Sequence, residues 1–424
     1  MDANPEPTTT TIDHATCLAC GCLCDDITLT VEGGRIVEAA RACPIGRPWF
    51  LAPAPGESSP SATIEGEPCD LDRALDRASE ILRAARGPVL WGLAWASIEA
   101  QRVAVAIADR LGAAVDLDGA HPALLRGFQR SGQVSSTLGE VKDRADLVVY
   151  WGVDPASTHP RLGERHALEP RSRFLPRGRL DRTLIVVDHR PTPSAALADL
   201  HLAIPPDRRV QALWTLRALA QEVPLAAEPA AEVPFESLEN LAQALARARF
   251  GALFFDPSAR DSFEAEGILT LVRDLNQGRR FVALPLGPGG NQSGAEATLA
   301  WQTGFPAAVD FALGYPRHLP VDATLAARLE AGSVDAALIV AGDPPDRLSA
   351  QLRTIPTITI APGATRPGPP STVAIDVARL GIEEGGTVAR SDGVMLPLRP
   401  ALAPLLPTAR AVLEALRLRL VAAG

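Results

Sequence analysis

The sequence predicts a multi-domain α/β protein with doubly wound, mostly parallel sheets and a small N-terminal cysteine-rich β domain. Three observations predict this class. Short apolar runs alternate with amphipathic segments along most of the chain, which is typical of βαβ units. The chain has 424 residues, more than one hydrophobic core usually organises. Five of its six cysteines lie between residues 17 and 43, before the alternation begins.

The first element along the chain is a cysteine motif. Four cysteines follow the spacing C-x2-C-x3-C-x18-C: Cys17, Cys20, Cys24 and Cys43. Three thiols in one loop and one returning from a distance suit a cubane [4Fe-4S] cluster, in which each iron takes one soft sulfur ligand. Residues 27–39 read as two short strands around the turn Gly33-Gly34. That hairpin would carry Cys43 back to the other three.

Two alternatives to a cluster stay open for these cysteines. Structural zinc is often held by four thiolates, although it usually shows two C-x2-4-C pairs and only one standard pair occurs here. The thiols could also be metal-free. Disulfides fit poorly in a chain that shows no secretory signal. Cys22 and Cys69 lie outside the spacing and are interpreted as plain thiols.

Helices and strands then alternate. A helix at 70–86 stops at Gly87-Pro88, and a second is capped by Ser97 and followed by Gly112. Further helices are expected at 235–248, 261–277 and 410–420. Apolar runs predict buried strands at 88–95, 145–152, 183–188, 250–256, 280–287, 335–343, 355–362 and 372–377.

The sequence predicts four parts in the chain. We expect a disordered leader at 1–13, rich in Pro and Thr, and the cysteine-rich domain at 14–55. A Pro- and Ser-rich linker follows. Beyond the linker, we expect a first α/β domain from 60–155 with 290–424, and a second from 156–289.

Composition and charge exclude several classes of function. A net charge of −9 and a pI near 5.4 argue against a nucleic-acid partner, which would need a basic face. No run of 18 apolar residues predicts a membrane span, and the N-terminus lacks an apolar signal segment. Reduced thiols indicate the cytoplasm. An arginine-rich segment at 171–182 predicts an anionic ligand, a subunit contact or a solvated loop.

Three strand ends carry glycine, aspartate and arginine. In doubly wound sheets, ligands bind in the crevice beyond the carboxyl ends of the strands. Glycine lets the backbone approach a phosphate or a ring, aspartate accepts from a ribose or a guanine amino group, and arginine pairs with phosphate. Each strand end alone also fits an ordinary turn. Together they predict a nucleotide-type pocket built from six residues: Gly152, Asp154, Asp188, Arg190, Gly342 and Asp343.

The cysteine stretch C-x2-C-G-x2-C-D-D-I, followed by C-x-I-G, resembles the opening of the B subunit of formylmethanofuran dehydrogenase. Further stretches look like the same family: 158–161, 176–179, 290–295, 301–311 and 385–400. The family belongs to the molybdopterin oxidoreductase superfamily and has a formate dehydrogenase-like fold. The resemblance implies a [4Fe-4S] cluster beside a tungsten or molybdenum atom held by two pterin guanine dinucleotides.

One position departs from the family pattern. In the dehydrogenase, a cysteine directly before His-Gly ligates the metal, and the matching residue here is Ala120, followed by His121 and Pro122. Alanine has no donor atom, and a histidine is not the soft ligand that this metal takes in the family. We therefore assign no catalytic residue, and we expect no pterin guanine dinucleotide; the six strand-end residues would then be vestigial.

This departure resembles a variant of the family, the formyltransferase/hydrolase complex of tetrahydromethanopterin-dependent one-carbon metabolism. The resemblance implies a redox-inactive B subunit acting as a scaffold beside the A, C and D subunits, in the conversion of formaldehyde to formate. A methanofuran-type carrier would be contacted indirectly. The alternative is the catalytic subunit of a molybdenum or tungsten formylmethanofuran dehydrogenase that uses a ligand other than cysteine.

Overall fold

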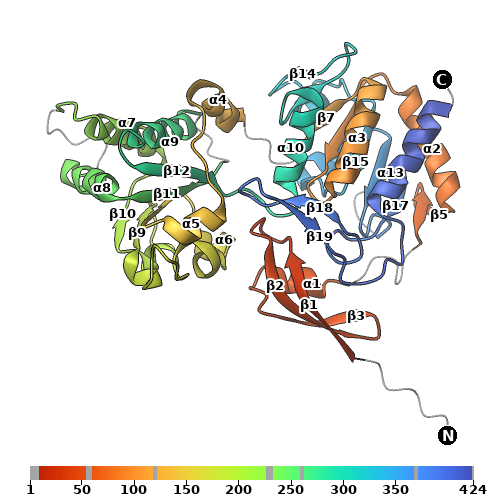
Figure 1. Ribbon diagram of the computed structural model, residues 1–424. Helices are drawn as coiled ribbons and strands as arrows, with labels where there is room; N and C mark the ends of the chain where they lie inside the picture. Colours follow the sequence, from red (N-terminus) through yellow and green to blue (C-terminus); the bar gives the residue numbers. More distant parts are fainter. Residues whose placement is uncertain are drawn as a thin grey trace, which may run out of the picture. The chain divides into compact units, whose positions relative to one another are not determined.

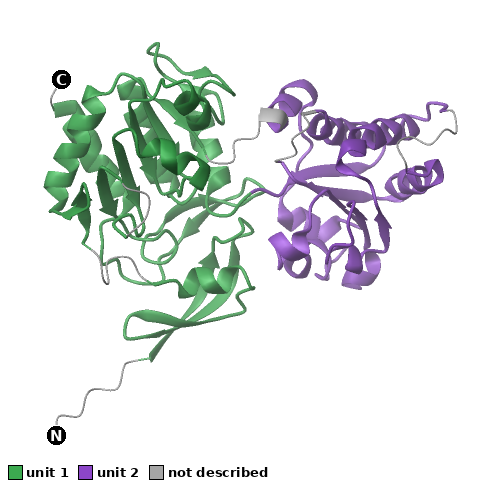
Figure 2. Ribbon diagram, turned by 180° about the vertical axis from the view of Figure 1, so that it is seen from behind, with its two compact units in different colours: residues 1–120, 288–424 green, residues 121–287 purple. Residues whose placement is uncertain are grey.

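The computed structural model describes residues 9–53, 60–117, 122–225, 233–257, 262–366 and 371–422. The chain forms two compact units, residues 1–120 with 288–424 (unit 1) and residues 121–287 (unit 2), coloured separately in Figure 2. The expected border near residue 155 differs from this division. Residues 121–155 belong to unit 2, because strand β8 (Leu147–Trp151) pairs with strands of that unit on both sides.

The cysteine-rich part of unit 1 is a three-stranded antiparallel sheet followed by a short helix (Figure 1). Its elements are β1 (Thr9–Cys17), β2 (Cys24–Glu32), β3 (Arg35–Ala40) and α1 (Gly46–Leu51). The turn between β2 and β3 passes through Gly33 and Gly34, whose φ angles of 56° and 80° place them in the left-handed region. The predicted hairpin is therefore present, and it leads the chain toward Cys43.

The predicted disordered leader is wrong for residues 9–13. These residues form the first part of β1, where Thr9 pairs with Glu32 and Ile12 with Leu29. Threonine is β-branched and favours extended backbone, and the edge of β2 offers it a hydrogen-bonding partner. Residues 1–8 lie outside the described residues.

A nine-stranded sheet forms the centre of unit 1. Its strands are, in spatial order, β14 (Arg317–His318), β13 (Val309–Asp310), β7 (Ala114–Asp116), β6 (Pro88–Gly92), β15 (Ala336–Val340), β16 (Thr357–Ala361), β17 (Val373–Asp376), β4 (Ala62–Ile64) and β5 (Glu67–Pro68). The five central strands from β7 to β17 run parallel, and antiparallel strands flank them. A separate hairpin is formed by β18 (Gly386–Ala389) and β19 (Met395–Leu398).

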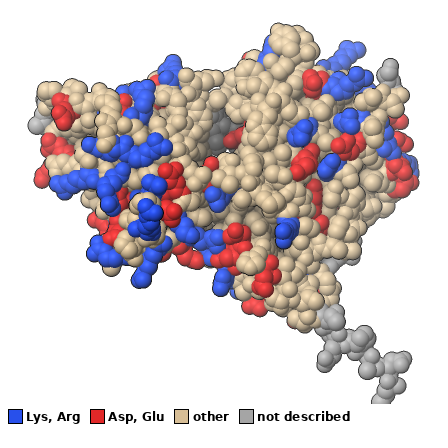
Figure 3. Space-filling view, viewed as in Figure 1, with Lys and Arg blue, Asp and Glu red and all other residues tan. Residues whose placement is uncertain are grey.

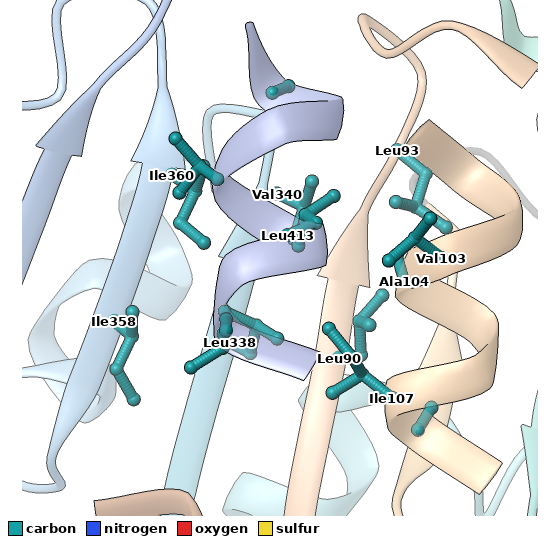
Figure 4. Packing of buried hydrophobic residues seen from close by; sticks show 14 of the residues in the cluster. Leu90, Leu93, Val103, Ala104, Ile107, Leu338, Val340, Ile358, Ile360 and Leu413 are labelled. Atoms are coloured by element: carbon teal, nitrogen blue, oxygen red, sulfur yellow. The ribbon is translucent and has the colours of Figure 1, made fainter. Parts of the chain in front are cut away.

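Helices cover both faces of this sheet. They are α2 (Leu71–Ala84), α3 (Ile98–Leu111), α10 (Gln292–Thr303), α11 (Leu325–Glu330), α12 (Asp346–Leu352) and α13 (Ala409–Ala422). Successive strand residues point to opposite faces. Leu90 and Leu338 pack with residues of α3 and α13 such as Ile107 and Leu413, as Figure 4 shows, whereas Trp91 and its neighbours pack against α11 and α12.

Local signals set the ends of α2 and α3, and those of α3 are the ones that the sequence predicts. The Asp70 side chain accepts a hydrogen bond from Arg73 N at 2.8 Å and so caps α2. The Ser97 hydroxyl caps α3 in the same way, and α3 ends at Gly112 in the left-handed conformation with φ 66°.

Unit 2 is built on a parallel sheet of five strands. In spatial order these are β10 (Leu200–Leu202), β9 (Thr183–Val187), β8, β11 (Phe250–Phe255) and β12 (Arg280–Pro285). Its helices are α4 (Pro122–Ser131), α5 (Leu138–Arg144), α6 (Pro155–Thr158), α7 (Arg209–Ala220), α8 (Phe235–Arg247) and α9 (Ser262–Leu275). Single turns occur at Gly163–Ala167, Gly178–Asp181, Ala195–Leu197 and Pro206–Arg208. The predicted fold class is thus confirmed. Among the described helices, none combines the length and apolar character needed to cross a membrane.

A buried asparagine joins three segments of unit 1. Asn291, at the start of α10, is completely buried. Its side-chain amide donates to Ala96 O at 2.9 Å, and its Oδ1 accepts from Ala389 N at 2.7 Å. Its main-chain carbonyl accepts from Gln101 Nε2 at 3.3 Å. The loop before α3, the start of α10 and strand β18 are therefore held together by one residue.

Replacing Asn291 by alanine should lower the free energy of unfolding by about 1–3 kcal/mol, because it leaves the buried Ala389 N without its acceptor, whereas Ala96 O keeps its bond from Gln101 Nε2. Urea denaturation measures this. Gln302→Ala is the matched control, since Gln302 is an exposed residue of the same helix. Its effect should stay within about 0.5 kcal/mol. Equal effects of the two substitutions would show that the hydrogen bonds of Asn291 do not hold these segments of unit 1 together.

A buried carboxyl group makes the stability of unit 1 dependent on pH. Glu384 is 4% exposed; it accepts from Ser97 Oγ at 3.3 Å and from Ala409 N at 3.1 Å. Burial, together with the nearby Glu99, raises the pKa of Glu384 from its ordinary value of 4.5 to about 7, although the hydrogen bonds from Ala409 and Ser97 and the charge of Arg410 oppose the rise. The folded state therefore holds this proton more tightly than the unfolded state. The resulting stabilisation is complete below pH 4.5 and is lost as the pH rises through about 7.

Glu384→Gln should therefore stabilise the protein at about pH 8 by roughly 1–3 kcal/mol, and should be close to neutral at about pH 5. The amide oxygen can still accept from Ala409 N. Urea denaturation at both pH values tests this, with the exposed Glu80→Gln as a control that should show no such pH dependence. The same difference from the wild type at both pH values would show that Glu384 does not titrate as described.

Candidate functional site

The thiols of the cysteine motif converge near the start of α1. Cys17 ends β1 and Cys24 begins β2, and the two residues face each other in the antiparallel register. Cys43 follows β3 and accepts a hydrogen bond from Gly46 N at 3.3 Å. A Cβ atom at Gly46 would lie 2.8 Å from Cys17 Sγ and 3.7 Å from Cys43 Sγ. Only glycine therefore leaves space for both sulfurs.

Electrostatic contacts connect all four cysteines chosen from the spacing. Burial raises the pKa of Cys17 to about 12, and the adjacent thiols of Cys20, Cys24 and Cys43 add to the rise. Four neighbouring thiolates would repel one another, so that a bound metal centre is the ordinary means of keeping such a set deprotonated. Such a donor set suits a cluster, in which each iron takes its own thiolate, better than a single metal ion.

The two remaining cysteines have different surroundings. The buried thiol of Cys22 is hydrogen-bonded to Cys20; this bond lowers the pKa of Cys20 to about 7 and raises that of Cys22. Cys69 lies just before α2, and burial raises its pKa. All six cysteines lie within the described residues, and none of them forms a disulfide. Within the same residues, no three His, Cys, Asp or Glu side chains form a group that could hold a metal ion.

The cysteine loop is fastened to the rest of unit 1. Gly290 N donates to Leu18 O at 2.7 Å, and Ser391 N donates to Gly21 O at 3.1 Å. A Cβ atom at Gly289 would clash with the carbonyl of Ala19 in the same loop. Close backbone approach at the glycines before α10 therefore fixes the position of the loop that carries the thiols.

A pocket of about 450 Å³ opens at the carboxyl ends of β15 and β16. Asp343, chosen from the sequence, lies in its wall with Gly342. Trp49 of α1 and Trp95 also line it, with their rings stacked and centroids 6.5 Å apart. The buried hydroxyl of Ser349 faces this pocket and has no hydrogen-bond partner among the described residues.

Two arginines on the pocket wall were not anticipated from the sequence. Arg379 forms a bidentate ion pair with Glu383, with nitrogen–oxygen distances of 2.6–3.2 Å, and donates to Ala52 O at 2.7 Å. Arg366 donates to Pro53 O at 3.3 Å. Both arginines therefore tie the end of the cysteine-rich part to the sheet, and neither carries a sequence signal that would have marked it.

The other predicted residues meet at the carboxyl ends of β8 and β9 in unit 2. Asp188 accepts from Arg190 N at 3.2 Å and lies 3.0 Å from His189 Nδ1. Asp154 accepts from Ser194 N at 3.0 Å and so ties the end of β8 to the loop after β9. The structure thus brings Gly152, Asp154, Asp188 and Arg190 to one edge, whereas Gly342 and Asp343 belong to unit 1.

A buried arginine completes the unit 2 site. Arg209, the first residue of α7, lies 3.8 Å from Asp188 and 3.7 Å from Glu264. Trp151 Nε1 donates to Glu264 at 3.0 Å. Arg209 Nε has no hydrogen-bond partner among the described residues. Sequence reasoning missed Arg209 and Glu264, because both are far along the chain from the strand ends that they meet.

Two of the predicted glycines are needed because of side chains of this protein. A Cβ atom at Gly152, whose φ is 64°, would clash with the guanidinium of Arg209. At Gly342 it would lie 2.8 Å from the ring of Trp91. A larger residue at either position would therefore clash with a side chain of this protein.

Ala120 and His121, which the family pattern singled out, lie outside the described residues. Their identity is fixed by the sequence: a methyl side chain precedes a histidine and a proline.

Comparisons with known proteins agree on one family, although no family model matches the chain. The B subunit of tungsten-containing formylmethanofuran dehydrogenase 2 from Methanocaldococcus jannaschii is 32% identical over 412 residues, covering 93% of this chain and 94% of the relative. The B subunit of the formyltransferase/hydrolase complex Fhc of Methylorubrum extorquens is 31% identical over 292 residues, covering 68% of this chain and 76% of the relative.

Solved structures extend this result. A chain in the crystal structure of the formyltransferase/hydrolase complex (FhcABCD) from Methylorubrum extorquens, in complex with methylofuran, superimposes with a TM-score of 0.72 at 29% identity. The match covers 86% of this chain and 99% of that chain. Acetylene hydratase from Pelobacter acetylenicus shares the fold alone, with a TM-score of 0.63 at 11% identity over 96% of this chain and 69% of that chain. The chain therefore belongs to the family of formylmethanofuran dehydrogenase B subunits.

Proposed function

We propose that this chain is the B subunit of a formyltransferase/hydrolase complex and serves it as a redox-inactive scaffold. The A, C and D subunits would be its partners, and the methanofuran-type carrier would reach it through them. The solved Fhc chain that superimposes on most of this chain supports the assignment. The absence of disulfides among the six cysteines supports a place in the reducing cytoplasm.

The observation that carries the proposal is the alanine at residue 120. Tungsten and molybdenum in the resembling dehydrogenase take a thiolate at this position. A methyl group donates no electron pair, and the imidazole of His121 is a harder donor than a thiolate. At this position the chain therefore offers no thiolate ligand for a metal that would oxidise a formyl group.

The two strand-end sites support the same proposal. Of the six residues expected to hold pterin guanine dinucleotides, Gly152 and Gly342 pack against side chains of this protein, and Asp154 is engaged by Ser194. Only Arg190 and Asp343 present exposed charged groups. From these contacts we infer that the two sites are vestigial.

The thiols are the part of the site that fits a cofactor. We propose that Cys17, Cys20, Cys24 and Cys43 hold a [4Fe-4S] cluster as a structural centre. Each iron takes one thiolate, so the four sulfurs need not meet at one point as the ligands of a single ion must. When bound, the cluster would join β1, β2 and the start of α1 by metal–thiolate bonds, which contribute folding free energy.

Metal analysis of the purified complex tests the scaffold proposal. Iron should be present, and tungsten or molybdenum should be well below one atom per chain. Transfer of a formyl group and release of formate should proceed without reduction of an artificial electron acceptor. Stoichiometric tungsten or molybdenum, together with formyl-dependent reduction of the acceptor, would show instead that the chain is the catalytic subunit of a dehydrogenase.

Serine substitutions test the cluster. Replacing any one of Cys17, Cys20, Cys24 or Cys43 should abolish broad visible absorption and lower the iron content from about four atoms per chain. Cys69→Ser is the matched control, since Cys69 lies beside α2, and it should leave both unchanged. Zinc in place of iron, no metal at all, or an equal effect of Cys69→Ser would each refute the assignment.

A further inference from the structure

An irregular segment of unit 2, residues 168–182, is held in one conformation by a buried arginine. Arg182 is 4% exposed. Its guanidinium donates to three main-chain carbonyls: Leu168 O at 3.1 Å, Pro170 O at 2.6 Å and Lys142 O at 2.6 Å. The segment is thereby fastened to itself and to α5, although it contains no strand.

A serine and a glycine shape the tip of the same segment. Ser172 Oγ donates to Asp143 O at 2.7 Å and accepts from the main-chain nitrogens of Phe174 and Leu175 at 3.2 and 3.0 Å. Gly178 has a φ of 63°, and a Cβ atom there would lie 2.6 Å from Glu169 O. The surface that this segment presents is consequently formed before any partner arrives, which reduces the entropy cost of binding.

That surface combines an aromatic ring with stacked guanidinium groups. Phe174 is 41% exposed, and the guanidinium carbons of Arg144 and Arg173 lie 4.5 and 5.1 Å from its ring centroid. Stacking uses the flat face of a guanidinium and leaves the N–H donors at its edge for other groups. Those donors match the two oxygens of a carboxylate.

The arginines of this surface differ in their partners. Arg177 and Arg179 form ion pairs with Asp181 and Asp199. Arg144, Arg171 and Arg173 are exposed, and no ion pair joins any of them to a carboxylate among the described residues. Figure 3 shows basic side chains gathered over this part of unit 2, although the whole chain carries a net charge of −9. We define the cationic patch as Arg144, Arg171, Arg173 and Phe174.

We infer that the cationic patch docks an acidic segment of a partner subunit. The inference rests on the proposed function, because it supposes that the chain assembles with other subunits. Arginine and aromatic residues dominate binding energy at protein interfaces. The residues of the patch are exposed, and Leu180 in the same segment is 78% exposed, whereas sites for small molecules are concave and bury most of their ligand. A run of aspartate and glutamate side chains would supply the carboxylates that the stacked arginines lack.

Charge reversal in the assembled complex tests this. The tagged full-length chain is produced together with its A, C and D subunits, and the subunits retained on it are quantified at about 0.1 M and about 1 M salt. The double variant Arg144→Glu/Arg173→Glu should lose one of them at least tenfold at the lower salt. At the higher salt, the wild type should approach the variant, because charge–charge attraction is screened.

Two further variants separate the patch from general effects. Arg280→Glu reverses an exposed charge of unit 2 outside the patch and should retain all subunits. Arg144→Lys/Arg173→Lys keeps the positive charge but replaces the planar guanidinium group by an ammonium group, and should give an intermediate loss of the bound subunit. Each variant should unfold at the wild-type urea concentration, since the altered side chains are exposed. Equal retention by Arg144→Glu/Arg173→Glu and Arg280→Glu would overturn the inference.

A photo-reactive residue in place of Phe174 identifies the occupant. Cross-linking to an Asp- and Glu-rich stretch of the A, C or D chain supports the inference, and cross-linking to a neutral or basic surface, or to none of them, overturns it. Failure of the proposed function gives a different result: the wild-type chain itself would then retain none of the A, C and D subunits at either salt concentration.

Discussion

The arrangement of unit 1 depends on the hydrogen bonds made where the chain re-enters it at residues 288–291. Gly290 N bonds the loop of the thiols, and the buried Asn291 bonds the start of α3 and strand β18. A buried amide is costly unless every one of its partners is in place. Segments separated by hundreds of residues must therefore assemble together. The thiol loop takes its position from this junction and not from its own short sheet alone.

Much of the fold could be predicted because its strands are buried on both faces. Parallel strands covered by helices appear in the sequence as continuous apolar runs, such as β11 and β15. Helix α3 was equally clear, since Ser97 and Gly112 mark its two ends. Strand β1 was missed because its Thr-rich sequence resembles a polar leader until β2 supplies its partner. Strands of two residues, such as β13 and β14, leave no pattern to find.

For the candidate sites, the sequence predicts which residues are present but not which side chains they contact. The four thiols could be chosen by spacing, because a hairpin of known length returns Cys43 to the loop. The strand-end residues could be placed at sheet edges, but their partners could not. Whether a glycine serves a ligand or a neighbouring side chain depends on what fills the space beside it. At Gly152 that neighbour is Arg209, which no local pattern connects to β8.

The four thiols of the cysteine motif and the alanine at residue 120 can occur together in one chain for a physical reason. A cysteine that ligates a catalytic metal serves the reaction at that metal. The cysteines at the start of unit 1 belong to a small three-stranded sheet, and domains of that size seldom bury enough apolar surface to be stable alone. Leu18 and Leu23 of the thiol loop also pack against Leu380, Val388 and Leu398. Loss of the cysteines would therefore disturb the junction on which unit 1 depends.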